Sequence, residues 1–273
     1  MTMVLKKILL LPALACVCAC GPKYYYEDAV QFEKRGLLLK AADRYRVFAE
    51  TNPKDERAPA SLFRAAEIYS RNFGLCGKAK PVFERLLKNY PAAPSRAAAM
   101  KGLFICPDYF PVDRPLSWTY GDSETGGVNA RQVTRLTVPA SGGAYTLTRI
   151  YAGKALISRQ KKFYAFADRD LIERRDGVDT IILKYPVEKD RSWGSSSGGR
   201  SARFTVEAVG VTVKVRAGEF TNCVKVKQQL EGIPSWIYEY YAPWTGRILT
   251  SVAGKGFEHR VIELIKYEET QKK

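Results

Sequence analysis

The chain contains little of what most enzymes and metalloproteins require. Its 273 residues include a single histidine, His259, no Cys-x-x-Cys pair and no Gly-x-Ser-x-Gly nucleophile elbow. A Ser-His or Cys-His nucleophile system would have to use His259, whose neighbours Glu258 and Arg260 favour an edge strand at the surface. A zinc site is equally disfavoured, because zinc prefers histidine and cysteine ligands. We therefore predict that the protein is not an enzyme and holds no metal or cofactor.

Acidic and glycine-rich motifs are also incomplete. Asp168-Arg169-Asp170 is followed by nothing that would finish a calcium loop. Gly198-Gly199 precedes no helical pattern, so a phosphate-binding turn is not predicted. Glu239 stands between two tyrosines, and only folding could bring a second carboxylate to it for acid–base work. The sequence assigns no catalytic residue.

The apolar run near the N-terminus is too short to cross a bilayer as a helix. It extends from Ile8 to Ala19, follows Lys6 and Lys7, and so has the order of a secretory signal peptide. Its end, Val17-Cys18-Ala19-Cys20, resembles the lipobox of bacterial lipoproteins. The resemblance implies a signal peptide over residues 1–19, acylation of Cys20 with chains such as palmitate, and a lipidated tether over residues 20–26. A register ending at Cys16 and ordinary secretion are the alternatives.

The resemblance also implies a location. More than one acyl chain gives stable membrane attachment. In lipoproteins of this class an Asp after the acylated cysteine favours the inner membrane, whereas this chain has Gly21. The expected location is the cell envelope, on the periplasmic face of the outer membrane.

Basic residues exceed acidic ones by 44 to 28, which gives a formal charge of +16. An exported protein meets little nucleic acid, so we predict no nucleic-acid partner and expect anionic lipid head groups or acidic polymers instead. A solvated basic surface without a ligand is an equal alternative. With 46% hydrophobic residues, the chain can form a proper core.

Residues 27–91 contain an internal repeat with an offset of 38. The matched pairs are Gly36 with Gly74, Ala41 with Ala79, Tyr45 with Phe83, Phe48 with Leu86, and Pro53 with Pro91. Their spacing resembles the tetratricopeptide repeat, whose usual period is 34 residues. Residues 27–108 are therefore predicted to form two helical hairpins and one further helix that begins after Ser95. Because stacks of this family usually need three repeats, the next domain is expected to cover the end.

Three cysteines remain after processing: Cys76, Cys106 and Cys223. An odd number in an oxidising compartment is most simply one pair and one free thiol. In stacked repeats, the helix ends that carry Cys76 and Cys106 are neighbours, which predicts a disulfide between them. Two separate buried thiols are the alternative. Cys223 is predicted to be a structural thiol.

From residue 111 to 268 the pattern changes to alternation, and residues 269–273 form a tail. This alternation of β-branched and aromatic residues, with turn residues between, predicts an antiparallel domain of nine or ten strands. The predicted strands are 133–138, 145–151, 157–166, 180–185, 202–207, 211–216, 224–227, 235–241, 247–252 and 260–267. The low-complexity segment 192–199 is predicted to be a flexible loop.

The segment Glu239–Ile248 contains Tyr240, Tyr241, Ala242, Pro243 and Gly246. It resembles bacterial envelope β domains whose pattern reads Tyr-Tyr-Ala-Pro-Gly-Val-Gly-Leu-Val. It departs from that pattern at Trp244 and Thr245, which predicts a different turn that exposes an aromatic ring. The resemblance implies an open half-barrel similar to the lipoprotein-carrier fold. The fold class predicted is α+β: N-terminal tetratricopeptide-like hairpins followed by an antiparallel β half-barrel or curved sheet.

Two functions follow from these resemblances. In the first, the helical repeats dock an envelope protein, and the lipoprotein is an accessory or scaffold in an assembly. In the second, the β domain holds a lipid or the acyl chain of a lipoprotein. The first is preferred because the repeat pattern is the more specific of the two.

Overall fold

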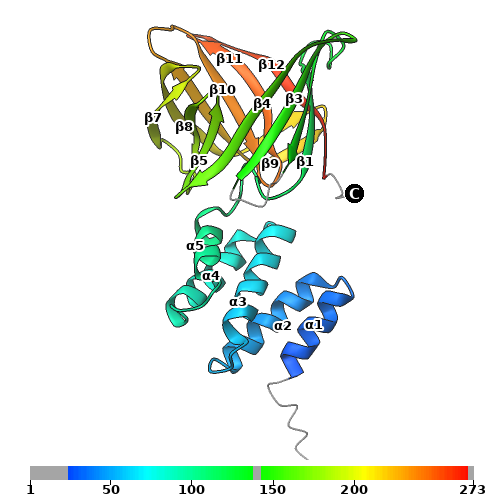
Figure 1. The fold of residues 1–273 in the computed structure, drawn as a ribbon, viewed down its shortest axis with the longest axis vertical. Coiled ribbons are helices and arrows are strands. Elements are labelled where there is room, and N and C mark those ends of the chain that lie inside the picture. The colour runs from blue at the N-terminus through cyan, green and yellow to red at the C-terminus, as the bar shows by residue number, and fades with distance from the viewer. Residues whose placement is uncertain (1–23, 138–142, 270–273) are drawn as a thin grey trace, which may run out of the picture.

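A computed structural model describes residues 24–137 and 143–269. A β barrel forms one end of the molecule, and a small layer of helices lies beneath it (Figure 1). The predicted signal peptide, the acylation site Cys20 and all but the first residue of the predicted tail lie outside the described residues. None of the helices that the structure describes has the length and apolarity needed to cross a membrane.

Five short α-helices and one π-helical turn make up the helical layer. They are α1 (Tyr24–Lys34), α2 (Leu38–Thr51), α3 (Ala58–Glu67), η1 (Ile68–Asn72), α4 (Cys76–Asn89) and α5 (Arg96–Phe104). Alanines lie where the helices approach each other, and aromatic rings such as Tyr45 and Phe83 fill the space between them. Because α1 begins at Tyr24, the last three residues of the predicted tether are helical.

Twelve antiparallel strands form the barrel. They are β1 (Leu116–Asp122), β2 (Ala130–Thr137), β3 (Gly143–Ala152), β4 (Ala155–Ala167), β5 (Asp170–Arg175), β6 (Val178–Lys184), β7 (Ser192–Ser197), β8 (Arg200–Val215), β9 (Gly218–Leu230), β10 (Trp236–Ala242), β11 (Gly246–Gly254) and β12 (Phe257–Glu269). Apart from the β1–β12 pair, neighbours in the sheet are neighbours in sequence. Bulges in several of the paired strands bend the sheet so that it curls around a lumen.

The first and last strands of the sheet, β6 and β7, meet at a seam. No backbone ladder joins them within the described residues, and the sheet order ends at each. Side chains bridge the seam instead: the Ile181 amide donates to the Ser195 hydroxyl at 2.7 Å, and the Trp193 indole donates to the Ile181 carbonyl at 2.8 Å. The barrel is therefore nearly closed.

The segment between α5 and β1 fastens the helices to the barrel. Asp108 is buried there, and burial raises the pKa of its carboxyl to about 6. Its Oδ1 accepts the Phe110 amide at 2.9 Å, and its backbone carbonyl accepts the Trp244 amide at 2.6 Å. Arg71 at the end of η1 pairs with Asp113 at 2.7 Å. Polar contacts thus fix the helical layer to one end of the barrel.

The predicted fold class is wrong. Strands hold 48% of the described residues, and the sheet nearly closes on itself where a half-barrel was expected. The helical part consists of five short helices and not of an N-terminal repeat domain of the tetratricopeptide kind. Closure follows because β1 pairs with β12 along its length and thereby joins the two halves of the sheet.

Two local predictions also fail. Residues 192–197 form strand β7 and not a flexible loop, since they pair with β8 from Ser192, opposite Thr205, to Ser197, opposite Arg200. β12 lies between β1 and β11 and is not an edge strand of the sheet, although His259 is exposed as predicted and lies beyond the β1 pairing, which ends at Ile262. Segments 202–207 and 211–216 belong to one strand, β8, which bulges between them.

Candidate ligand site in the barrel lumen

The interior of the barrel contains a cavity of about 660 Å³, here called the lumen cavity. This volume is within the range of small-molecule sites. The cavity reaches from aromatic residues near the helical layer to the turns at Asp176 and Gly198-Gly199. Alternation along each strand places every second side chain in the lumen. The chemistry of the cavity is therefore set by the inward positions of the strands.

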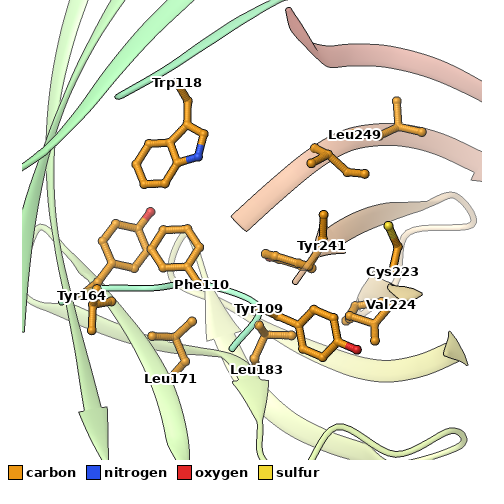
Figure 2. Packing of buried hydrophobic residues seen from close by; sticks show 14 of the residues in the cluster. Tyr109, Phe110, Trp118, Tyr164, Leu171, Leu183, Cys223, Val224, Tyr241 and Leu249 are labelled. Atoms are coloured by element: carbon orange, nitrogen blue, oxygen red, sulfur yellow. The ribbon is translucent and has the colours of Figure 1, made fainter. Parts of the chain in front are cut away.

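Aromatic rings form the floor of the lumen cavity. Phe110, from the segment after α5, lies 5.8 Å from Trp118 of β1 and 4.7 Å from Tyr164 of β4, measured between ring centroids. Figure 2 shows these three rings grouped inside the barrel, with Tyr241 nearby. The Trp118 indole donates to the Thr245 carbonyl at 2.7 Å. The chain entering from the helices thus closes this end of the lumen.

A half-buried ion pair lies in the wall above the floor. Arg247 of β11 donates to Glu239 of β10 at 2.8 Å, and the Tyr241 hydroxyl donates to the other carboxylate oxygen. Burial alone would raise the pKa of Glu239, but attraction to Arg247 and these hydrogen bonds outweigh it and hold that pKa below its ordinary value. Burial raises the pKa of Tyr241 well above 10. Glu239 is therefore ionised and neutralised by Arg247.

A second ion pair faces the lumen from β4 and β5. Lys162 lies 2.8 Å from Glu173, which also accepts the Tyr164 hydroxyl at 2.5 Å. Burial, with Glu173 nearby, raises the pKa of Tyr164 well above its ordinary value. Folding thus brings two carboxylates, Glu173 and Glu239, to one cavity. Each already accepts from a cation and a tyrosine hydroxyl, which leaves neither as a free acid or base.

The remaining walls carry neutral polar groups. Thr134 and Thr148 share a hydrogen bond of 2.9 Å between their hydroxyls, and Gln228 donates to Ser197 at 2.6 Å. The other neutral polar residues that line the cavity are Gln132, Thr146, Gln160 and Thr180. Amides and hydroxyls both donate and accept hydrogen bonds. The lumen cavity thus combines aromatic faces, paired charges and neutral hydrogen-bonding groups.

The residues of the β-domain pattern lie around the floor rather than forming a site themselves. Tyr241 lines the cavity, whereas Tyr240 points outward, and its hydroxyl donates to Glu258 at 2.6 Å. Ala242 is buried, and Pro243 opens the turn into β11. Gly246 has a φ of +102° and lies against Trp118, a backbone conformation that favours glycine.

Trp244, where the chain departs from the pattern, contacts the helical layer. Its indole lies beside Gly74, and the Arg114 guanidinium lies 5.9 Å from its ring. Trp244 has a φ of +60°, and its ring is only partly exposed. Its ring joins the barrel to the helices.

The predicted repeat residues lie within the helical layer, away from the lumen. Ala41, Tyr45, Ala79 and Phe83 are buried. Gly36 and Gly74 lie between helices and have positive φ angles. Pro53 and Pro91 follow α2 and α4, and the Tyr90 hydroxyl donates to the Pro53 carbonyl.

Cys76 and Cys106 are bonded to each other, with their Cα atoms 5.6 Å apart. The bond joins the start of α4 to the segment after α5. Cys223 is free and buried in the barrel wall, and burial raises the pKa of its thiol to about 11. A thiol with that pKa is protonated at neutral pH and is unreactive as a nucleophile.

Sequence reasoning missed the two lumen ion pairs. A signal for one of them was present: Gln160, Lys162 and Tyr164 are alternate residues of β4 and therefore share a face. Two polar residues on the same face of a strand as a buried tyrosine indicate that this face lines a polar interior. The pairing of Glu239 with Arg247 depends on the β10–β11 register, which includes a bulge between Tyr240 and Tyr241.

No family model matches the chain, and no curated protein matches it. Two solved structures are similar to it. One, from Bacteroides fragilis, is provisionally described as an exported protein with a YmcC-like fold; it is 16% identical, with a TM-score of 0.42, over 60% of this chain and 100% of the other. The second, from Parabacteroides distasonis, is provisionally described as a lipoprotein; it is 10% identical, with a TM-score of 0.37, over 59% of this chain and 98% of the other.

Proposed function

We propose that the protein is a membrane-anchored envelope lipoprotein that binds a neutral, polyhydroxylated ligand, such as an oligosaccharide, in the lumen cavity. The observation that carries this proposal is the lining. Charges inside the lumen occur as neutralised pairs, and the groups between them are amides, hydroxyls and aromatic rings. A sugar offers hydroxyls to the amides and threonines that line the cavity.

The same lining disfavours the acyl-chain ligand predicted from the sequence. An alkyl chain in the cavity would remove water from Gln132, Gln160 and Thr180 without offering hydrogen bonds in return. Burial of an unpaired polar group costs about 1–3 kcal/mol. A charged ligand is also disfavoured, because Lys162 and Arg247 already have carboxylate partners.

Binding without chemistry accords with the state of the two lumen carboxylates. Glu173 and Glu239 are each held by a cation and a tyrosine hydroxyl, so neither is poised for proton transfer. Docking of an envelope protein on the helical layer stays a prediction from the sequence. The lumen supplies the better-defined site.

A variant pair on one strand tests the proposal. Thr134 faces the lumen from β2 and Thr137 is exposed on the outside of the same strand. Saturation-transfer NMR with neutral mono- and oligosaccharides should detect binding to the wild-type chain. Thr134→Trp fills part of the cavity and should weaken binding at least about tenfold, equivalent to about 1.4 kcal/mol. Thr137→Trp should leave binding unchanged. Equal binding by all three proteins would place the ligand outside the lumen.

A further inference from the structure

The three adjacent strands β2, β3 and β4 have an unusual charge. Residues 130–167 contain seven Lys or Arg residues and no Asp or Glu. Lys162 points inward and pairs with Glu173. Lys154 lies in the turn between β3 and β4. The other five are exposed on the outside of the barrel and are here called the outer basic face: Arg131, Arg135, Arg149, Arg159 and Lys161. None of these five forms a salt bridge with a residue that the structure describes.

The strand register concentrates these cations. Arg149 lies directly opposite Arg159, and Leu147, two positions along, lies between Arg135 and Lys161. Like charges directly opposite each other in a sheet are destabilising. The outward positions of the neighbouring strands do not neutralise these cations. β1 presents Ser117 and Thr119, and on the other side Asp179 is already bonded to Arg174.

Apolar and aromatic side chains are interleaved with the cations. Tyr145, Leu147 and Leu156 are about two-fifths exposed, and Ile157, the bulge residue of β4, is 63% exposed. Lys161 lies 4.4 Å above the Tyr145 ring, and Arg131 lies 4.9 Å from the Tyr151 ring. Cations beside exposed leucine, isoleucine and tyrosine are the composition of surfaces that bind at the membrane–water interface. β3 and β4 lie side by side on the side of the barrel (Figure 1).

We propose that the outer basic face docks on an anionic lipid surface. The Arg149–Arg159 pair has no acidic partner among the described residues, and lipid phosphates can provide one. The exposed Leu147, Leu156 and Ile157 favour lipid over an acidic polysaccharide, because a hydrated polymer gives these side chains no apolar medium to enter. Docking would hold the barrel against the membrane independently of any acyl chain at Cys20.

The test uses the mature chain from residue 20 with Cys20→Ser, so that no acyl chain contributes. Co-sedimentation compares vesicles of phosphatidylglycerol and phosphatidylcholine in equal parts with vesicles of phosphatidylcholine alone. Because each cation near an anionic surface strengthens binding about fivefold, replacing Arg135, Arg149, Arg159 and Lys161 together with Gln should weaken binding to the anionic vesicles by roughly several hundredfold. Ile157→Ser should weaken it severalfold.

A matched control separates this face from net charge. Lys88, Lys189, Arg203 and Lys255 are exposed and scattered over other elements, and their joint replacement with Gln makes the same change in charge. That control should lose less than about tenfold of the affinity. Removing the Arg149–Arg159 repulsion should leave the melting temperature unchanged or raised. If the fourfold variant fails to fold, the double variant Arg149→Gln/Arg159→Gln carries the same comparison.

Three results would overturn the proposal. The wild-type chain could bind both kinds of vesicle equally, the two fourfold variants could lose equal affinity, or soluble polygalacturonate could bind through the outer basic face while anionic vesicles fail to compete. Loss of vesicle binding with sugar binding retained would also show that this face and the lumen act separately.

Discussion

Replacing Arg247 with methionine is expected to lower the free energy of unfolding by about 2–3 kcal/mol at neutral pH. Removing one partner of a fully buried ion pair costs about 3–5 kcal/mol. The loss expected here is smaller because solvent in the lumen cavity reaches the pair. The variant leaves Glu239 ionised in the barrel wall, where the Tyr241 hydroxyl still donates to it. Urea unfolding of the wild-type and variant chains measures the difference.

The expected loss depends on pH, and its sign follows from Glu239. In the wild-type protein the pKa of Glu239 lies below 4.5, so its ionised form stabilises the fold above that pH and the contribution is lost as pH falls through the folded-state pKa. Without Arg247, burial dominates and the pKa rises above 4.5. The variant then gains relative stability as pH falls through the raised pKa, and its difference from wild type should shrink toward pH 4.

The double variant Glu239→Gln/Arg247→Met is the control. Its glutamine can still accept the Tyr241 hydroxyl, and no buried charge remains. It should therefore recover at least half of the stability lost in Arg247→Met and show no pH-dependent difference from wild type in this range. If the single and double variants are equally stable at neutral pH, the ion pair does not stabilise the wall as described.

Replacing Trp118 with alanine is expected to lower the free energy of unfolding by about 3–5 kcal/mol. Trp118 is 1% exposed, stacks on Phe110, and joins β1 to the turn between β10 and β11 through its bond to the Thr245 carbonyl. In a domain of this size the loss corresponds to a fall in melting temperature of roughly 10 °C. Thermal unfolding by circular dichroism measures it.

Trp118→Phe separates the packing from the hydrogen bond. Phenylalanine keeps most of the apolar ring but cannot donate to Thr245, so a loss of about 1–2 kcal/mol is expected. A Trp118→Ala protein that melts within about 2 °C of wild type would mean that the floor of the lumen is not part of the core.

The strands could be predicted largely from alternation, but the closure of the barrel could not. β5 reads Asp-Leu-Ile-Glu-Arg-Arg and was missed because Glu173 and Arg175 point into a polar lumen where an apolar core was assumed. β7 was missed because its only large apolar residue is Trp193, on the seam. The half-barrel itself was predicted from the resemblance to envelope β domains, and closure at the β6–β7 seam has no signal in the alternation pattern.

Two helical hairpins and a further helix were predicted within residues 27–108, and five α-helices lie between Tyr24 and Phe104, but they do not form the repeat domain that was expected. Apolar residues at helical spacing fix each segment, and positive φ at Gly36 and Gly74 ends the preceding helical segment. The contacts that attach the layer to the barrel, such as Trp244 beside Gly74, join residues 170 positions apart (244 − 74). Contacts at that separation leave no periodic signal in one sequence.

The lumen site is the least predictable part. Its polar residues come from most of the twelve strands, and they become one site only when β1 pairs with β12 and β6 meets β7. The resemblance to lipid-carrying half-barrels led the sequence analysis toward an apolar cavity. The paired charges of Glu239 with Arg247 and of Lys162 with Glu173 give the lumen a different character.

Isothermal titration calorimetry with two ligands of similar size tests the central claim most directly. The wild-type chain and Thr134→Trp would each be titrated with a neutral oligosaccharide that passes the NMR screen and with a fatty acid such as oleate. We predict that the oligosaccharide binds the wild-type chain, that Thr134→Trp weakens it at least about tenfold, and that oleate gives no saturable binding. Saturable binding of oleate that is lost in Thr134→Trp, with no binding of the sugar, would contradict the account and show that the lumen holds an acyl chain.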